Sequence, residues 1–167
     1  MTRLFLLAAA SIALAGGAQA VPVTFTTTLS GPGESPPTTS PGTGAGTVVF
    51  DVGAHTLTVS ETFSGLLAGT TASHIHCCAV PPTNAGVATQ VPRFTGFPVG
   101  VMSGTYSHTF DMTDPASYNP AFVNANGGTV ASAESVLLAG LLAGQAYLNI
   151  HTTTHPGGEI RGVLALT

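Results

Sequence analysis

Residues 146–162 read AYLNIHTTTHPGGEIRG, and this stretch decides the fold. Its first part, residues 146–150, has the composition of a β-strand, and a second strand-like run extends from Ile160 to Leu166. Between the two runs lies the pair Gly157-Gly158, which is typical of a tight reversal of the chain. The stretch therefore predicts an antiparallel hairpin.

Several runs upstream of this hairpin also have the composition of β-strands. In residues 55–63, Leu57, Val59 and Glu61 alternate with threonine and serine, which places these three side chains on one face of a strand. Residues 46–52 precede this run across a short turn, so the two runs predict a second hairpin. The strand-like runs upstream are residues 23–29, 46–52, 55–63, 72–77, 99–102 and 106–110.

Two segments carry helical signals. Asp114-Pro115 is typical of an N-cap followed by a first-turn proline and predicts a helical turn over residues 116–118. Residues 132–142 have helical composition, whereas residues 30–46 are a loop-rich segment of glycine, proline, serine and threonine. The chain is thus predicted to be all-β, an antiparallel β-sandwich or a barrel-like single domain over residues 21–167, with one or two short helical segments.

One internal repeat is present. GLLAG is followed by six residues and a histidine twice, at residues 65–76 and at residues 140–151, so that His76 corresponds to His151. The alternative is a chance match in a chain rich in alanine, leucine and glycine, but the shared endings HIH and NIH argue against chance. The repeat predicts that two strands ending in these histidines lie side by side.

The histidines have the spacing of metal ligands. His74 and His76 are two residues apart on one strand, so their side chains share a face and lie about 7 Å apart along it. If His151 lies on a neighbouring strand, three imidazoles converge, a set that suits zinc or copper. The alternative is that all three are hydrogen-bonded structural residues.

Five more residues are candidates around this set. His155 could supply a fourth imidazole, and Cys78, on the His76 face by strand alternation, could supply a sulfur ligand. Asn149 takes the place of His74 in the second repeat and would lie beside the ligands. Glu159 could orient a ring nitrogen. Alternatively, Glu159 and Arg161, two residues apart on one strand face, are structural residues that pair with each other or with neighbouring groups.

The two cysteines, Cys77 and Cys78, are adjacent, so they cannot link distant segments of the chain. A disulfide between them would close a small, strained ring and be easily reduced. Free thiols or a role at a metal are the alternatives.

The charge balance limits the partners. The chain contains three basic residues, all arginines, against seven acidic residues, and its formal net charge is −4. We therefore expect no nucleic-acid partner and no binding to an anionic membrane.

The first twenty residues have the pattern of a secretory signal peptide. Arg3 precedes an apolar run over residues 4–15, and Ala18-Gln19-Ala20 is a small-residue cleavage motif. Cleavage after Ala20 would release a secreted or periplasmic chain. No later segment has the roughly 18 continuous apolar residues of a membrane helix, so we expect no stable membrane insertion of the mature chain.

Three motifs resemble the CHRD (chordin-type) domain family: ESPP at residues 34–37, SHIH at residues 73–76 and, above all, residues 146–162. The resemblance runs from Val23 to Leu166, and the HIHCC form at residues 74–78 resembles a bacterial exported subgroup. It implies an extracellular or periplasmic β-sandwich-like domain. Residues 91–134 fit the family pattern less closely.

Three functions are compatible with these features of the sequence. The favoured one is an exported, non-enzymatic binding domain with a histidine site for copper or zinc. The second is a structural or protein-interaction module without metal, whose partner would be an extracellular or periplasmic protein. The third is a metal-dependent redox enzyme, because the HxH motif is similar to that of copper/zinc superoxide dismutases. Enzymatic activity is the weakest expectation, since no residue pattern indicates a substrate.

Overall fold

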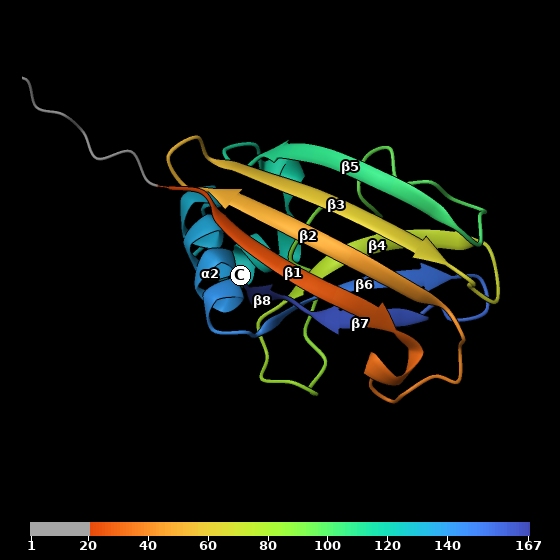
Figure 1. Ribbon diagram of the computed structural model, residues 1–167. Helices are drawn as coiled ribbons and strands as arrows, with labels where there is room; N and C mark the ends of the chain where they lie inside the picture. The colour runs from red at the N-terminus through yellow and green to blue at the C-terminus, as the bar shows by residue number, and fades with distance from the viewer. Residues whose placement is uncertain (1–20) are drawn as a thin grey trace, which may run out of the picture.

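The computed structural model describes residues 21–167 (Figure 1). The predicted signal peptide, residues 1–20, lies outside these described residues. The elements in chain order are β1 (Val23–Ser30), η1 (Gly31–Gly33), β2 (Thr43–Asp51), β3 (Thr56–Ser64), β4 (Thr70–Cys77), β5 (Gly104–Asp111), η2 (Pro115–Ser117), α1 (Pro120–Ala125), α2 (Val130–Leu142), β6 (Ala146–Thr152), β7 (Ile160–Val163) and β8 (Ala165–Leu166).

The strands form one antiparallel sheet that curls into a half-barrel (Figure 1). Neighbouring strands follow the order β4-β6-β7-β1-β2-β3-β5, and β8 pairs with β1. The predicted all-β, barrel-like fold with short helices is confirmed. Among the described residues, no helix is long and apolar enough to cross a membrane.

The inner face of the curled sheet holds the core. Alternate residues of the strands point inward, and Phe25, Phe50, Leu57, Leu148 and Ile150 are completely buried. Burial of such apolar side chains is the main stabilising term of the fold. Helix α2 lies at one end of the half-barrel, where it packs against β4, β6 and β8 (Figure 1).

The long loop between β4 and β5, residues 78–103, spans the two edge strands of the sheet. Phe94 is fully buried and stacks on Tyr106 of β5, with 5.8 Å between the ring centroids. The backbone N–H of Phe94 donates to the carbonyl of Ser73 in β4, and the Tyr106 hydroxyl donates to the carbonyl of Thr95. The loop thus lies against both edge strands and contacts β4 from Thr70 to Cys77.

The predicted elements need two corrections. Residues 99–102 are not a strand, because Gly100 has a positive φ of 75° and the backbone bonds of the segment to Leu66 and Thr70 do not form a regular ladder. Residues 30–46 are not loop throughout, because β2 begins at Thr43, where small residues fit between β1 and β3. The predicted helical segments are present as η2 and α2, and α1 was not predicted.

Candidate metal centre

The outer face of β4 and β6 brings His74, His76 and His151 together. The two strands pair antiparallel, with His74 opposite Asn149 and Ala72 opposite His151. Because side chains alternate along a strand, His74, His76 and His151 all point to the outer face. Their ligand nitrogens lie within 4.8 Å of one another, and all three residues are buried. The predicted juxtaposition of the repeat strands is confirmed.

Each imidazole binds one backbone carbonyl. His74 Nε2 lies 2.8 Å from the carbonyl oxygen of Pro92, His76 Nδ1 lies 2.9 Å from that of Ala85, and His151 Nδ1 lies 3.0 Å from that of Pro156. A carbonyl oxygen only accepts hydrogen bonds, so each of these nitrogens carries a proton. In a neutral ring the other nitrogen then carries a lone pair and no proton.

Burial keeps the rings neutral. Removal from solvent, together with the neighbouring His151, lowers the pKa of His74 to about 4. Burial likewise lowers the pKa of His76 to about 4, and that of His151 is also lowered. All three rings are therefore neutral near pH 7, the form in which imidazole binds metals.

The remaining nitrogens face each other without a proton between them. His74 Nδ1 and His151 Nε2 are 3.2 Å apart, yet both are lone-pair atoms once the other nitrogens donate to carbonyls. His76 Nε2 is buried and has no hydrogen-bond partner among residues 21–167. Buried polar atoms normally have partners, and one metal ion would satisfy all three nitrogens. The triad can hold a metal ion.

Aromatic and cationic side chains support the His76 ring. Tyr147 stacks on it at 4.8 Å between centroids, and the Tyr147 hydroxyl donates to the same Ala85 carbonyl that His76 binds. The Arg161 guanidinium lies 4.5 Å above the Tyr147 ring, a favourable cation–π geometry. Tyr147 lies within residues 146–162, but its contact with His76 was not predicted from the sequence.

Arg161 also binds the loops that cover this face. Its guanidinium donates to the carbonyls of Gly33 and Pro82 and to the side-chain oxygen of Asn84. It lies 3.8 Å from the carboxylate of Glu34. Arg161 is therefore a positioning residue that attaches the loops before and after the site to β7.

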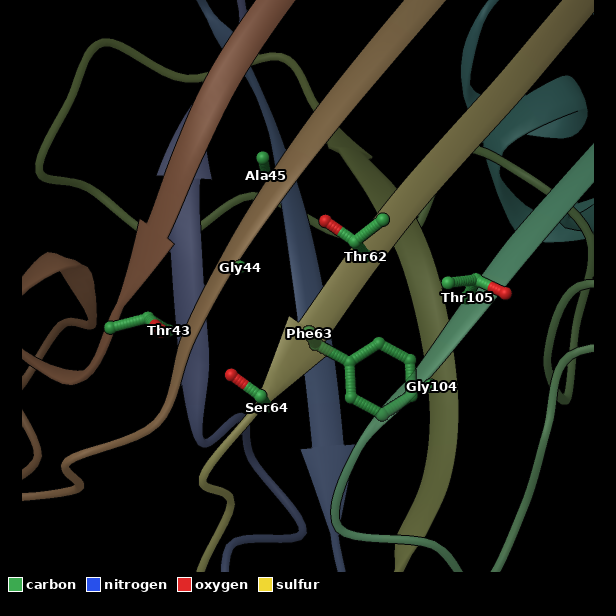
Figure 2. Close-up of a pocket in the computed structure, with 8 residues that line it drawn as sticks. All are labelled: Thr43, Gly44, Ala45, Thr62, Phe63, Ser64, Gly104 and Thr105. Atoms are coloured by element: carbon green, nitrogen blue, oxygen red, sulfur yellow. The ribbon is translucent and has the colours of Figure 1, made fainter.

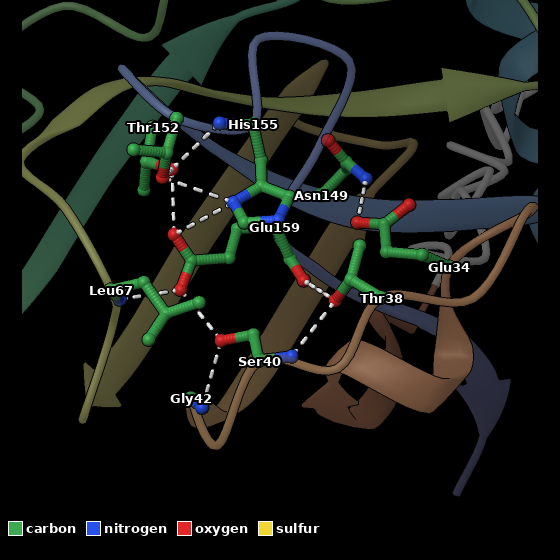
Figure 3. Close-up of polar contacts among 10 residues, drawn as sticks. Glu34, Thr38, Ser40, Gly42, Leu67, Asn149, Thr152, His155 and Glu159 are labelled. Carbon is green, nitrogen blue, oxygen red and sulfur yellow. Dashed lines mark hydrogen bonds and ion pairs between the residues drawn. The ribbon is translucent and has the colours of Figure 1, made fainter.

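Glu34 is a buried carboxyl that sequence reasoning noted only within the ESPP motif. Burial raises the pKa of Glu34 to about 7, although Arg161 and the side-chain amide of Asn149 oppose the shift. Asn149 Nδ2 donates to Glu34 Oε1 at 2.7 Å (Figure 3). The other amide atom, Asn149 Oδ1, is buried and has no partner in the described part of the chain.

Glu159 lies in a hydrogen-bond network beside the turn after β6. Its carboxylate accepts hydrogen bonds from the hydroxyls of Ser40 and Thr152 and from the backbone N–H of Leu67 (Figure 3). Burial alone would raise the pKa of Glu159, but these bonds outweigh it and lower the pKa. Backbone carbonyls orient the three ligand rings, so Glu159 instead holds the turn after β6 to two other loops.

His155 and Cys78 lie apart from the triad. The Nδ1 atom of His155 is 3.6 Å from Glu159 Oε2 and belongs to the Glu159 network (Figure 3). Cys78 is bonded to Cys77 in a disulfide, and its sulfur lies 3.7 Å from the carbonyl oxygen of Val136 in α2. Cys78 was predicted as a sulfur ligand from strand alternation, but β4 ends at Cys77, so the alternation does not continue to Cys78.

Two hollows differ in how they relate to the triad. One of about 440 Å³ is lined by Glu34, Asn84 and Pro156, and thus lies behind the loops that carry the ring-binding carbonyls. Another, of about 370 Å³, lies between the ends of β2, β3 and β5 (Figure 2). Figure 2 shows hydroxyls and Phe63 around this second hollow, and none of the residues that line it is titratable. Only the first hollow adjoins the candidate site.

Comparison with known proteins gives one result. The family model described as the CHRD domain matches residues 25–164. Neither a curated protein nor a solved structure matches the chain. The match includes β4, β6 and β7, and with them every residue of the triad. Since it covers most of the sequence, the chain belongs to the CHRD domain family.

Proposed function

We propose that this protein is an exported metal-binding domain that holds one copper or zinc ion through His74, His76 and His151. The observation that carries the proposal is the 3.2 Å contact between His74 Nδ1 and His151 Nε2. The opposite nitrogen of each ring is bound to a carbonyl, so this contact joins two lone pairs. A cation between them turns a repulsive contact into two bonds.

The donor set favours a borderline metal. It consists of neutral imidazoles, which suit zinc and copper, and it includes no thiolate because both cysteines are in a disulfide. Copper(II) binds nitrogen sites more tightly than zinc(II), so we expect copper(II) to bind with the higher affinity in vitro. A water molecule or the Asn149 amide oxygen would complete the coordination.

The test is a metal titration of metal-free protein by isothermal calorimetry, with copper(II) and zinc(II) in separate runs. We expect one equivalent to bind, and each of the changes His74→Ala, His76→Ala and His151→Ala to weaken binding by a factor on the order of 100. His155→Ala is the matched control and should leave the affinity unchanged. Binding that survives the loss of His151 would refute the proposal.

A structural role without metal is the second candidate. The observation in its favour is that each ring ties a loop to the sheet through its carbonyl bond, so the triad could stabilise a surface that binds an extracellular or periplasmic protein. That role requires the histidine variants to lose stability while the wild-type protein binds no metal. The titration above separates the two functions.

Export is supported by the sequence alone. Arg3, the apolar run over residues 4–15 and Ala18-Gln19-Ala20 form the expected signal pattern. Expression of the full chain in a bacterium with export machinery, followed by N-terminal sequencing of the periplasmic fraction, should give Val21 as the first residue. Retention of Met1 in a cytoplasmic fraction would count against export.

A further inference from the structure

A second reactive group lies at the end of β4, on the side of helix α2. Cys77 and Cys78 form a disulfide between adjacent residues. Cys77 is 5% exposed, whereas Cys78 is exposed to solvent. The two residues therefore differ in exposure, and Cys78 is the one that is more open to an external reagent.

A groove leads to this disulfide. It has a volume of about 330 Å³ and lies between the disulfide, α1 and α2, with Val87, Phe122 and Val136 as apolar walls and Asn119 and Asn126 as polar ones. Small-molecule sites commonly have volumes of about 300–1,000 Å³ and this mixture of apolar walls and a few polar groups. The groove is therefore better suited to bind a small molecule than to bind the surface of another protein.

Helix α2 also packs directly against the disulfide. Gly140 leaves no space there, because a side chain at this position would contact Cys77 Sγ and Cys78 Sγ. A nucleophile must approach a disulfide sulfur from the side opposite its bonded partner. The helix packs against both sulfurs, so the approach of a nucleophile depends on the exposed side of the disulfide, which belongs to Cys78.

We propose that the Cys77–Cys78 disulfide is a thiol-exchange site for a low-molecular-weight thiol that binds in this groove. The thiolate attacks Cys78 Sγ and forms a mixed disulfide, while the electron pair of the broken bond goes to Cys77 Sγ, which takes up a proton. A second thiol attacks the sulfur of the first and releases Cys78 as a thiol. Two external thiols are thereby oxidised to one disulfide, and the protein disulfide gains two electrons and two protons.

The proposal does not depend on the metal centre. The groove is lined by α1, α2 and the loop after β4, and no histidine of the triad is among its lining residues. Thiol exchange can therefore be measured on metal-free protein.

The test compares two variants that differ only in the sulfur that remains. Cys77→Ser leaves the exposed Cys78, and Cys78→Ser leaves the buried Cys77. With oxidised glutathione as the probe, intact-mass spectrometry measures how fast one glutathione adds to each folded variant. We expect Cys77→Ser to react faster by a factor on the order of ten or more, and the difference to vanish in urea. Equal rates in the folded variants would overturn the proposal.

The wild-type protein provides an independent measurement should a variant not fold. Reduced glutathione is added, the reaction is stopped with acid, and the adduct is located by fragmentation. A transient glutathione on Cys78 is the expected result, whereas an adduct on Cys77, or no reaction until the protein is unfolded, would contradict the assignment.

The groove and the size of the thiol are tested separately. Val136→Trp fills the groove and should slow the reaction with glutathione, while Ser135→Trp, on the exposed side of the same helix, should not. Reduced thioredoxin serves as a protein dithiol and should react more slowly per thiol than glutathione. A faster reaction with thioredoxin, or no effect of Val136→Trp, would rule out a small thiol in the groove.

Discussion

The two halves of the curled sheet have different outer faces. On β1, β2, β3 and β5 the outward side chains are mostly hydroxyls in contact with solvent, and cross-strand pairs such as Thr58–Thr109 and Ser60–Ser107 bond at 2.8 Å. On β4, β6 and β7 the outward side chains are rings, an amide and a guanidinium, namely His74, His76, Tyr147, Asn149, His151 and Arg161, and all are buried.

The difference comes from the loops. Residues 31–42 and 78–103 fold over β4, β6 and β7, and their backbone carbonyls accept hydrogen bonds from the rings and the guanidinium. The hydroxyl face of β1, β2, β3 and β5 satisfies its polar groups with solvent and with one another. Polar side chains that are both buried and oriented occur where loops cover the sheet, so the covered half is where a ligand site can form.

The largest expected effect of a substitution is at Arg161. Arg161→Leu removes the bonds to three loop groups and leaves Glu34 without its buried partner. Loss of one partner from a buried ion pair costs about 3–5 kcal/mol of stability. Urea unfolding should show this loss, and Arg93→Leu, at an exposed arginine, is the matched control with an expected change below about 0.5 kcal/mol. Similar losses in both variants would mean that the loops do not depend on Arg161.

Metal should stabilise only a protein with the complete triad. At a free metal concentration 100 times the dissociation constant, binding to the native state adds about 2.7 kcal/mol to the free energy of unfolding. His151→Ala should abolish this gain, whereas His108→Ala, on β5 of the other half, should keep it. Stabilisation of the His151 variant by the same metal would place the site elsewhere.

Glu61 lies on the inner face of β3, in the hydroxyl-faced half of the sheet. Its burial makes the stability of the fold depend on pH. Burial raises the pKa of Glu61 to about 8, opposed by the hydrogen bond from Ser73. The folded state therefore favours the protonated acid, and its contribution to stability is complete below about pH 4.5 and is lost as the pH rises through 8. Glu61→Gln should flatten the fall in stability between about pH 4.5 and 8. An unchanged slope would show that Glu61 does not cause it.

The smallest effect is expected on the exposed hydroxyl face. The double change Thr58→Val and Thr109→Val removes one cross-strand hydrogen bond at the surface but keeps the shape of both side chains. Such pairs contribute about 0.2–1 kcal/mol, so the urea midpoint should move little. A loss as large as that of Arg161→Leu would erase the contrast between the two halves.

The sequence predicted the strands and the meeting of the histidines because both follow from local patterns. The alternation of Leu57, Val59 and Glu61 indicated an inward face, and all three are buried. The two GLLAG segments indicated neighbouring strands, although the first lies in a loop and the second ends α2. The first GLLAG segment follows a strand and the second continues a helix. The repeat therefore could not predict the secondary structure of the two segments.

The surroundings of the triad could not be predicted in the same way. The carbonyls of Ala85, Pro92 and Pro156 reach the rings only because of the path that the loops take over the sheet. Every residue has such a carbonyl, so no residue type identifies these three. His155 and Glu159 were predicted near the ligands from their closeness in sequence, but the turn after β6 directs them to Ser40 and Thr152.

The most direct test of the account is an anomalous-difference map from crystals of metal-loaded protein, recorded at the absorption edge of the bound metal. If the triad binds the metal, we expect one peak on the outer face of β4 and β6. It should lie about 2.0–2.1 Å from His74 Nδ1, His76 Nε2 and His151 Nε2. A peak at His155 and Glu159 instead, or no peak at the triad in protein that has taken up one equivalent of metal, would contradict it.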